Sequence, residues 1–204
     1  MSNKNNAINQ IISDLKLLFS KEEILPKEIE DILSQFKSEE VKAYIRALSE
    51  GSKPESALRE SFFAGNSVLS KYLFKEISPE IYIGEGFIDY LIKAEYNRVI
   101  PLELKSLFSA EFETIKGNRI LKKLKQSTLE WESHKSQILK YLQKGREYII
   151  LTNIKEWYFF NKTCASDEFN YFHSTNLFDF LEEYEVQENL FDYLERKEFE
   201  SIRG

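Results

Sequence analysis

The 204-residue chain contains few of the residues that cross-link or interrupt a fold: one cysteine, four prolines and seven glycines. Because Cys164 is alone, an intrachain disulfide and a zinc site built on cysteine pairs are both excluded. His134 and His173 have no Cys or His beside them at metal-ligand spacing, so we interpret both as ordinary polar positions. The scarcity of Gly and Pro, with 42% apolar and 14% aromatic residues, predicts an ordered domain with a sizeable core.

Long apolar runs are also missing. No run approaches the roughly 20 residues that cross a bilayer. The first ten residues are polar and rich in asparagine, unlike a signal peptide. We therefore expect a cytoplasmic protein with no membrane partner.

Charge is distributed unevenly along the chain. The net charge of -6 argues against a free-standing, tight nucleic-acid binder. Residues 115–146 nevertheless hold nine Lys or Arg and two acids, whereas residues 167–204 hold eleven acids and three bases. The basic segment has two interpretations that the sequence leaves open, a solvated helix face or a face directed at phosphates.

Apolar spacing predicts most of the helices. It predicts helices over 5–19, from Pro26 to about 36, over 39–49, over 52–76, over 118–144 and over 176–203. In the fourth, Ser52 fits the N-cap, Pro54 the first turn and Glu55 the third position of a capping box. Pro79 is expected to end that helix.

β-rich segments predict the strands. They cover 81–92, 99–108, 148–153, 156–161 and an edge strand at 169–173, with Gly84 and Gly86 in the turn into the first hairpin. The order of elements predicts an α/β fold, a small mixed sheet flanked by helices. We expect a helical region at 1–50, a core at 51–175 and an acidic helix at 176–204 that leads towards a following domain.

Two carboxylates and a lysine stand out within these strands. Asp89 lies on one predicted strand, and Glu103 and Lys105 lie on the next. Since side chains alternate along a strand, Glu103 and Lys105 share a face and Leu104 takes the other. Hard oxygen ligands suit Mg²⁺, and a nearby amine can stabilise a transition state. The alternative is a half-exposed strand that happens to carry Glu and Lys. The apolar flanks argue against it, because buried charges are costly unless they are paired.

These residues resemble the PD-(D/E)XK nuclease superfamily. The resemblance lies in the order of Asp89, thirteen intervening residues and Glu103-Leu104-Lys105, with Ile88 where the family often has proline. Downstream, Gln137 and Tyr141 have the Q-x-x-x-Y spacing of one helix face, followed by strands that contain Thr152-Asn153 and Trp157 to Phe160. This combination resembles the N-terminal endonuclease domain of Type IIG restriction-modification enzymes.

The resemblance implies a restriction-endonuclease-like fold with Mg²⁺ as cofactor. Asp89, Glu103 and the carbonyl of Leu104 would be metal ligands, and Lys105 would position or activate water. Gln137 would orient a group of the site, with support from Tyr141. Glu55 matches an early helix in which the family places a further acid, but it also fits the helix cap, and the sequence leaves both roles open.

The resemblance also implies partners. Double-stranded DNA would be the substrate and would face the 115–146 segment. The chain has no methyltransferase motif and no evident base-reading module, so we expect a methyltransferase and a target-recognition domain in the same chain or complex. Double-strand cleavage would involve a transient dimer. The alternatives are the nuclease domain of a Type I-like restriction subunit, a non-catalytic nuclease-fold interaction domain and an unrelated helical adaptor.

Overall fold

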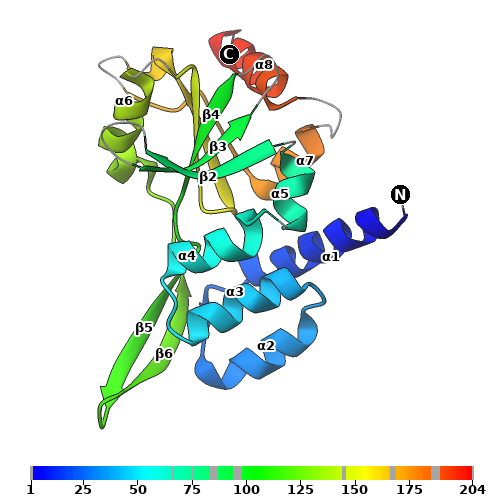
Figure 1. Cartoon of the computed structure of the whole chain (residues 1–204), viewed down its shortest axis with the longest axis vertical. Coiled ribbons are helices and arrows are strands. Elements are labelled where there is room, and N and C mark those ends of the chain that lie inside the picture. Colours follow the sequence, from blue (N-terminus) through cyan, green and yellow to red (C-terminus); the bar gives the residue numbers. More distant parts are fainter. Residues whose placement is uncertain are drawn as a thin grey trace. The chain divides into compact units, whose positions relative to one another are not determined.

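The chain folds into two compact units, as seen in a computed structural model (Figure 1). The structure describes residues 2–65, 67–74, 76–82, 87–93, 98–143, 146–165, 169–184 and 189–203. The first unit comprises Met1–Tyr72 and Ser106–Thr128, and the second comprises Leu73–Lys105 and Leu129–Gly204. The units do not coincide with the predicted regions 1–50, 51–175 and 176–204, because residues 106–128 join the N-terminal helices rather than the main sheet.

The first unit combines helices with a small sheet. Its helical elements are α1 (Ser2–Phe19), the 3-10 turn η1 (Pro26–Glu28), α2 (Ile29–Gln35), α3 (Glu39–Ser49), α4 (Pro54–Leu58) and the π-helical turn η2 (Arg59–Phe63). Its three-stranded sheet has the order β1 (Glu23–Ile24), β6 (Asn118–Gln126) and β5 (Phe108–Ile115). The first three predicted helices are confirmed, and the apolar stripe of α2 (Ile29, Ile32 and Leu33) is buried as its spacing requires.

The predicted capping box at Ser52 is wrong. The N-cap of α4 is Lys53, and its side chain makes no capping hydrogen bond. Ser52 instead completes the end of α3: its N–H donates to Ala47 O at 2.9 Å, while Gly51 N–H donates to Leu48 O at 3.1 Å. Gly51 has a φ of 94°, as this C-terminal motif requires. Ser52 therefore belongs to the helix that ends, not to the one that begins.

The predicted helix over 52–76 is also interrupted. The helical backbone ends at Phe63, and Ala64 is extended with a ψ of 151°. A separate helix, α5 (Val68–Leu73), follows. Ser67 initiates α5, since its Oγ accepts from Ser70 N–H at 3.3 Å. Ser67 thus starts a new helix within a sequence whose apolar spacing predicted one continuous helix.

The long basic helix predicted over 118–144 is wrong. Residues 118–126 form strand β6, which pairs antiparallel with β5, and only α6 (Lys135–Gln143) is α-helical, after the 3-10 turn η4 (Trp131–His134). The register shifts between Glu111 and Phe112. This bulge places the buried Leu121 and Leu124 three residues apart, a spacing that imitates a helix.

The second unit is built on a six-stranded mixed sheet, which confirms the predicted α/β class. Its strands, in sheet order, are β2 (Glu76–Tyr82), β3 (Phe87–Lys93), β4 (Val99–Leu104), β7 (Tyr148–Thr152), β8 (Glu156–Asn161) and β9 (His173–Asn176). The β4–β7 pair is parallel and the other pairs are antiparallel. The remaining helical elements are α6, the 3-10 turn η5 (Lys162–Ala165), α7 (Leu177–Glu183) and α8 (Leu190–Arg203).

Several predicted boundaries in this unit need correction. Pro79 does not end a helix but lies within β2, an edge strand where a missing N–H is tolerated. The strand predicted over 99–108 ends at Leu104, the edge strand begins at His173, and the last helix is two helices. Gly84 and Gly86, predicted to lie in a turn, are outside the described residues, as are residues 94–97 between the predicted strands 81–92 and 99–108.

The two faces of this sheet bury different aromatic sets. On β8, Trp157 and Phe159 point to the face where Phe180 of α7 and Tyr193 of α8 pack, with ring centroids 5.0–6.0 Å apart. The next residue, Phe160, contributes to a cluster on the other face with Ile138 and Tyr141 of α6 and with Leu151 of β7. Helix α6 is thereby fixed over β7. No helix in the described part of the chain is both long and apolar enough to cross a membrane.

Candidate active site

Asp89, Glu103 and Lys105 meet where β3 and β4 lie side by side. The antiparallel register pairs Tyr90 with Leu102, so the next position along brings Asp89 opposite Glu103. Directly opposite residues share a face of the sheet. Asp89 Oδ2 also accepts from Leu104 N–H at 2.8 Å, which ties the carboxylate to the backbone between Glu103 and Lys105. The predicted juxtaposition of these side chains is thus present in the second unit.

Both carboxylate oxygens of Glu103 are engaged by neighbouring side chains. Lys105 Nζ lies 2.9 Å from Oε1, and the Tyr141 hydroxyl donates to Oε2 at 3.3 Å. Gln137 Nε2 donates in turn to the Tyr141 hydroxyl oxygen at 3.0 Å. Glu103 itself is only 5% exposed. Gln137 and Tyr141 lie on one face of α6, as the predicted i and i+4 spacing requires, and that face is directed at Glu103.

The backbone around Lys105 is held by the neighbouring parallel strand. Lys105 N–H donates to Thr152 O at 2.9 Å, just past the end of the β4–β7 pairing. Thr152 Oγ1 accepts from Ile154 N–H at 2.9 Å and donates to Glu156 O at 2.7 Å. Ile154 has a φ of 73°, a costly conformation for a β-branched residue. The Thr-Asn motif therefore ends in a tightly bonded turn beside the lysine.

Glu156 follows the turn at Thr152, and the sequence gave no indication of its role. Its carboxylate accepts from Leu129 N–H at 3.0 Å, which anchors the segment that leads into α6. Asn153 Nδ2 donates to the same carboxylate oxygen at 3.3 Å. The anchor is long-range, so no local sequence pattern could have revealed it.

Burial and a like charge dominate the electrostatics of Glu103. Removal from water raises the pKa of its carboxyl, and the charge of Asp89 raises it further, while Lys105 opposes both. Burial also raises the pKa of Tyr141 to about 12. Tyr141 is therefore protonated at neutral pH, and since it accepts from Gln137, its hydroxyl proton is directed at Glu103.

His134 is a second neighbour that the sequence did not indicate. Burial lowers the pKa of its imidazole, and the nearby positive charge of Lys105 lowers it further. His134 ends η4, directly before α6. The sequence predicts an ordinary polar position for His134, and nothing near it in the sequence indicates that it lies close to Lys105.

The donor chemistry of the cluster fits Mg²⁺. Mg²⁺ in proteins is held by one or two carboxylates together with waters and substrate phosphates. Asp89 and Glu103 supply two carboxylates, and a cation between them would offset the repulsion that raises the Glu103 pKa. Within the described ranges no group of three or more His, Cys, Asp or Glu is arranged to hold a metal.

Glu55 belongs to the first unit, where it lies exposed in the first turn of α4. Its alternative role in a capping box fails, as described above. Its predicted role as a further site acid remains a prediction, because Asp89 and Glu103 belong to the second unit.

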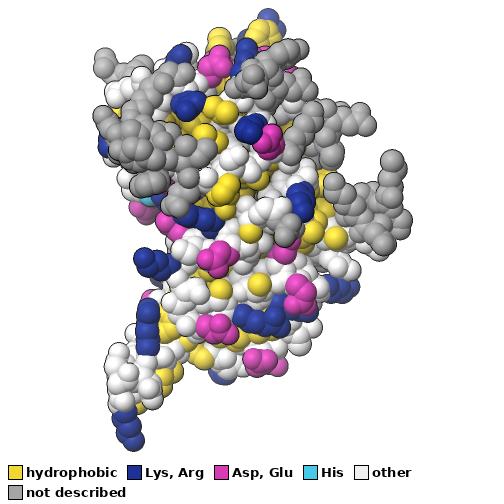
Figure 2. Space-filling view, in the orientation of Figure 1, with side chains coloured by type: hydrophobic (Ala, Val, Ile, Leu, Met, Phe, Trp, Pro, Cys, Tyr) yellow, Lys and Arg dark blue, Asp and Glu magenta, His cyan; other side chains and the backbone are white. Residues whose placement is uncertain are grey.

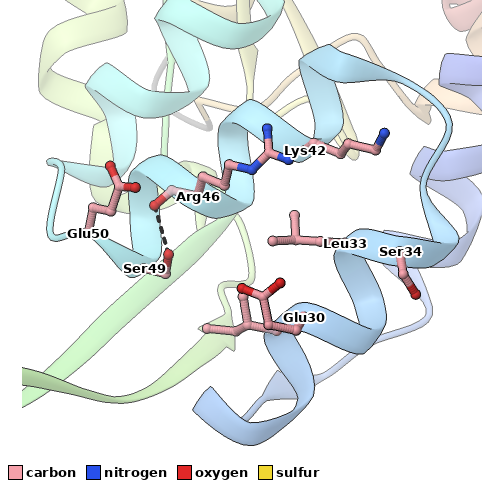
Figure 3. A pocket seen from close by; sticks show the side chains of 8 residues that line it. Glu30, Leu33, Ser34, Lys42, Arg46, Ser49 and Glu50 are labelled. Atoms are coloured by element: carbon pink, nitrogen blue, oxygen red, sulfur yellow. Dashed lines mark hydrogen bonds between the residues drawn. The ribbon is translucent and has the colours of Figure 1, made fainter.

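A cavity of about 490 Å³ lies between α2 and α3 of the first unit (Figure 3). It is lined by acids and bases together, including Glu30, Glu50, Lys42 and Arg46. Lys42 is ion-paired with Glu39 at 2.7 Å, and Ser49 Oγ donates to the backbone of Arg46. None of the predicted site residues lines this cavity, and its charges of both signs favour no ligand class.

Comparisons of the chain with protein-family models, with curated proteins and with solved structures find no match. The assignment of function therefore rests on the residues and their geometry.

Proposed function

We propose that the chain is a Mg²⁺-dependent DNA endonuclease module with a PD-(D/E)XK-type core, and that it serves as the cleavage module of a Type IIG restriction-modification enzyme. One observation carries the proposal. Glu103 is buried with Lys105 on one oxygen and Tyr141 on the other, beside Asp89 of the adjacent strand. Few structural roles need two carboxylates and an amine at one point of a sheet.

The alternative of a chance Glu-x-Lys on a solvated strand does not account for the burial. A carboxylate removed from water costs several kcal/mol unless partners compensate, and an apolar residue would serve the fold better. Here the partners leave the Glu103 pKa raised, so compensation is incomplete. Retaining a destabilising charge supports a functional role over a structural one.

The proposed chemistry is hydrolysis of a phosphodiester. Water oxygen bonds to phosphorus, one ester oxygen leaves, and the water proton passes to solvent as the leaving oxygen gains one. Mg²⁺, when bound, would polarise the phosphate and make water more acidic. Asp89, Glu103 and the Leu104 carbonyl would hold it. Lys105 would donate to a phosphate oxygen and orient the attacking water, which stabilises developing charge.

Tyr141 and Gln137 would act as positioning residues. The hydroxyl proton of Tyr141 is directed at Glu103 Oε2 because Gln137 occupies its acceptor side. That bond keeps one carboxylate oxygen in a fixed orientation, which matters for a ligand that must hold near-ideal octahedral geometry. The turn at Thr152 would fix Lys105 in the same way through its backbone.

The proposal includes division of labour with other domains. The net charge of -6 opposes long-range attraction to DNA, which fits a module that acts beside a target-recognition domain and a methyltransferase. Cleavage of both strands would bring two copies together transiently.

Metal removal tests the proposed function. The full-length protein should nick or linearise supercoiled plasmid in Mg²⁺ and leave it intact when EDTA replaces the metal, because the phosphate then lacks charge compensation. Agarose gels of a time course measure this. Equal nicking in EDTA, or no cutting in Mg²⁺ under conditions where the protein binds the plasmid, would reject a metal-dependent nuclease.

A further inference from the structure

The β5–β6 hairpin extends beyond the helices of the first unit as a two-stranded ribbon (Figure 1). Every residue from 113 to 120 is exposed. The turn has positive φ at both central residues, 50° at Lys116 and 82° at Gly117, which is the tight hairpin geometry that matches strand twist. The free end therefore has a defined turn geometry although its residues are exposed.

The base of the hairpin is firmly anchored. Phe108, Leu121 and Leu124 are buried, all on one face. On the same face, the guanidinium of Arg119 lies 3.9 Å from the ring centroid of Phe112. The Phe112 ring also lies close to Gly51, at the end of α3. An anchored base holds the exposed end in a fixed direction.

The opposite face of the free end carries an exposed apolar pair. Ile115 is 46% exposed and Ile120 is 43% exposed. The register pairs Glu113 with Ile120 and Ile115 with Asn118, so the two isoleucines are diagonal neighbours on one face. Exposed large apolar residues on an otherwise free ribbon indicate a contact surface.

Charge complementarity indicates an anionic partner. Residues 114–122 carry three bases (Lys116, Arg119 and Lys122) and no acid, within a chain of net charge -6. Lys123, nearer the base, is ion-paired with Glu23 and Glu111. Figure 2 shows Lys and Arg side chains at the far end of the hairpin. The positive charge is thus concentrated where the ribbon is most accessible.

The dimensions match a DNA groove. Four residues per strand at about 3.4 Å each give a free length of roughly 14 Å. The major groove is about 12 Å wide and 8.5 Å deep and admits a two-stranded ribbon. Lysines at the edges would meet phosphates, and the isoleucines would meet thymine methyl groups, the apolar feature of that groove.

We propose that the free end of the β5–β6 hairpin enters the major groove of duplex DNA, with Lys116 and Lys122 on the phosphates and Ile115 and Ile120 at the base edges. This inference rests on the proposed function, since it names the surface by which the nuclease module holds its substrate. It replaces the predicted basic helix as the principal DNA contact, and it places that contact in the first unit.

The test measures binding separately from cleavage. Fluorescence anisotropy follows a labelled mixed-sequence duplex titrated with the chain in EDTA, at several salt concentrations. The double variant Lys116→Glu/Lys122→Glu should bind about tenfold more weakly at low salt, and its log–log salt slope should fall by about 2 because two phosphate contacts are lost. Ile115→Thr/Ile120→Thr should weaken binding while leaving the slope unchanged.

A matched control separates local contact from net charge. Lys27→Glu/Lys53→Glu makes the same change of charge at exposed positions of the same unit. It should change the affinity less than twofold. Three results would each overturn the proposal. They are an equal loss of affinity in the two charge variants, no binding by the wild type at low salt, and tighter binding of single-stranded than of duplex DNA. Matching melting curves show that the variants fold.

Failure of the hairpin inference can be distinguished from failure of the proposed nuclease function. If the hairpin variant loses affinity while plasmid cutting proves independent of metal, the binding surface stands and the nuclease chemistry fails. If cutting is metal-dependent and the hairpin variant binds like the wild type, the nuclease stands and the hairpin inference fails.

Discussion

Lys105→Ala should reduce DNA cleavage by the full-length protein by at least about 10²- to 10⁴-fold, the range that a positioned proton-transfer or charge-stabilising group contributes. Its amine lies 2.9 Å from Glu103 and is mostly buried, so no solvent cation replaces it. Duplex binding should change little, because the lysine stabilises the transition state more than the bound substrate. Initial rates of plasmid nicking, with anisotropy at matched protein concentration, measure both quantities.

Lys93→Ala is the matched control. Lys93 lies in the same sheet, on β3, and forms an exposed ion pair with Glu76, which contributes little to stability. The control should cleave at the wild-type rate. If Lys105→Ala cleaves as fast as Lys93→Ala, Lys105 has no role in the chemistry and the proposed mechanism is lost.

Glu103→Gln should abolish cleavage and, at neutral pH, raise the melting temperature. The carboxyl has a raised pKa in the folded protein because of burial first and Asp89 second. The folded state therefore favours the protonated form. The stability contributed by the protonated carboxyl is fully present below the ordinary glutamate pKa of 4.5, and it is lost as the pH rises through the raised pKa of the folded state. The ionised side chain therefore destabilises the fold at pH 7. A neutral amide of the same shape avoids this destabilisation.

The gain in melting temperature of Glu103→Gln over the wild type should depend on pH. If about 1 kcal/mol is recovered, the melting temperature rises by roughly 2–4 °C at pH 7 for a chain of this size, and the difference shrinks as pH falls towards 4.5. Glu76→Gln, at an exposed position of the same sheet, is the matched control and should change the melting temperature little at pH 7. Scanning calorimetry across pH measures it. A Glu103→Gln variant that is less stable than the wild type at pH 7 would mean that the ion pair with Lys105 outweighs burial.

The local part of the site was readable from the sequence. Alternation along a strand places Glu103 and Lys105 on one face, and helical spacing places Gln137 and Tyr141 on another, so each pair follows from a short-range rule. Their meeting depends on the pairing of β3 with β4 and on the packing of α6 against the sheet, which no short-range rule supplies. The roles of Glu156 and His134 could not be found, because the bond of Glu156 to Leu129 and the position of His134 near Lys105 both depend on long-range packing.

The errors in the fold share a physical cause. At β6 a bulge shifted the alternation and left buried leucines at helical spacing. At Ser52 a capping pattern was present, but the residue completes the C-terminal motif of α3 instead, through its hydrogen bond to Ala47. In both places a short pattern allowed two structures, and strand pairing or helix termination decided between them.

Metal binding by the candidate site tests the central claim most directly. Titration of the purified chain with Mn²⁺, a spectroscopic substitute for Mg²⁺, can be followed by the loss of the free-ion electron paramagnetic resonance signal. The wild type, in the presence of duplex DNA, should bind Mn²⁺ at a site that disappears in Asp89→Asn and in Glu103→Gln but persists in Glu76→Gln. Binding that is absent from the wild type, or unchanged in the two site variants, would contradict the assignment of Asp89 and Glu103 as metal ligands.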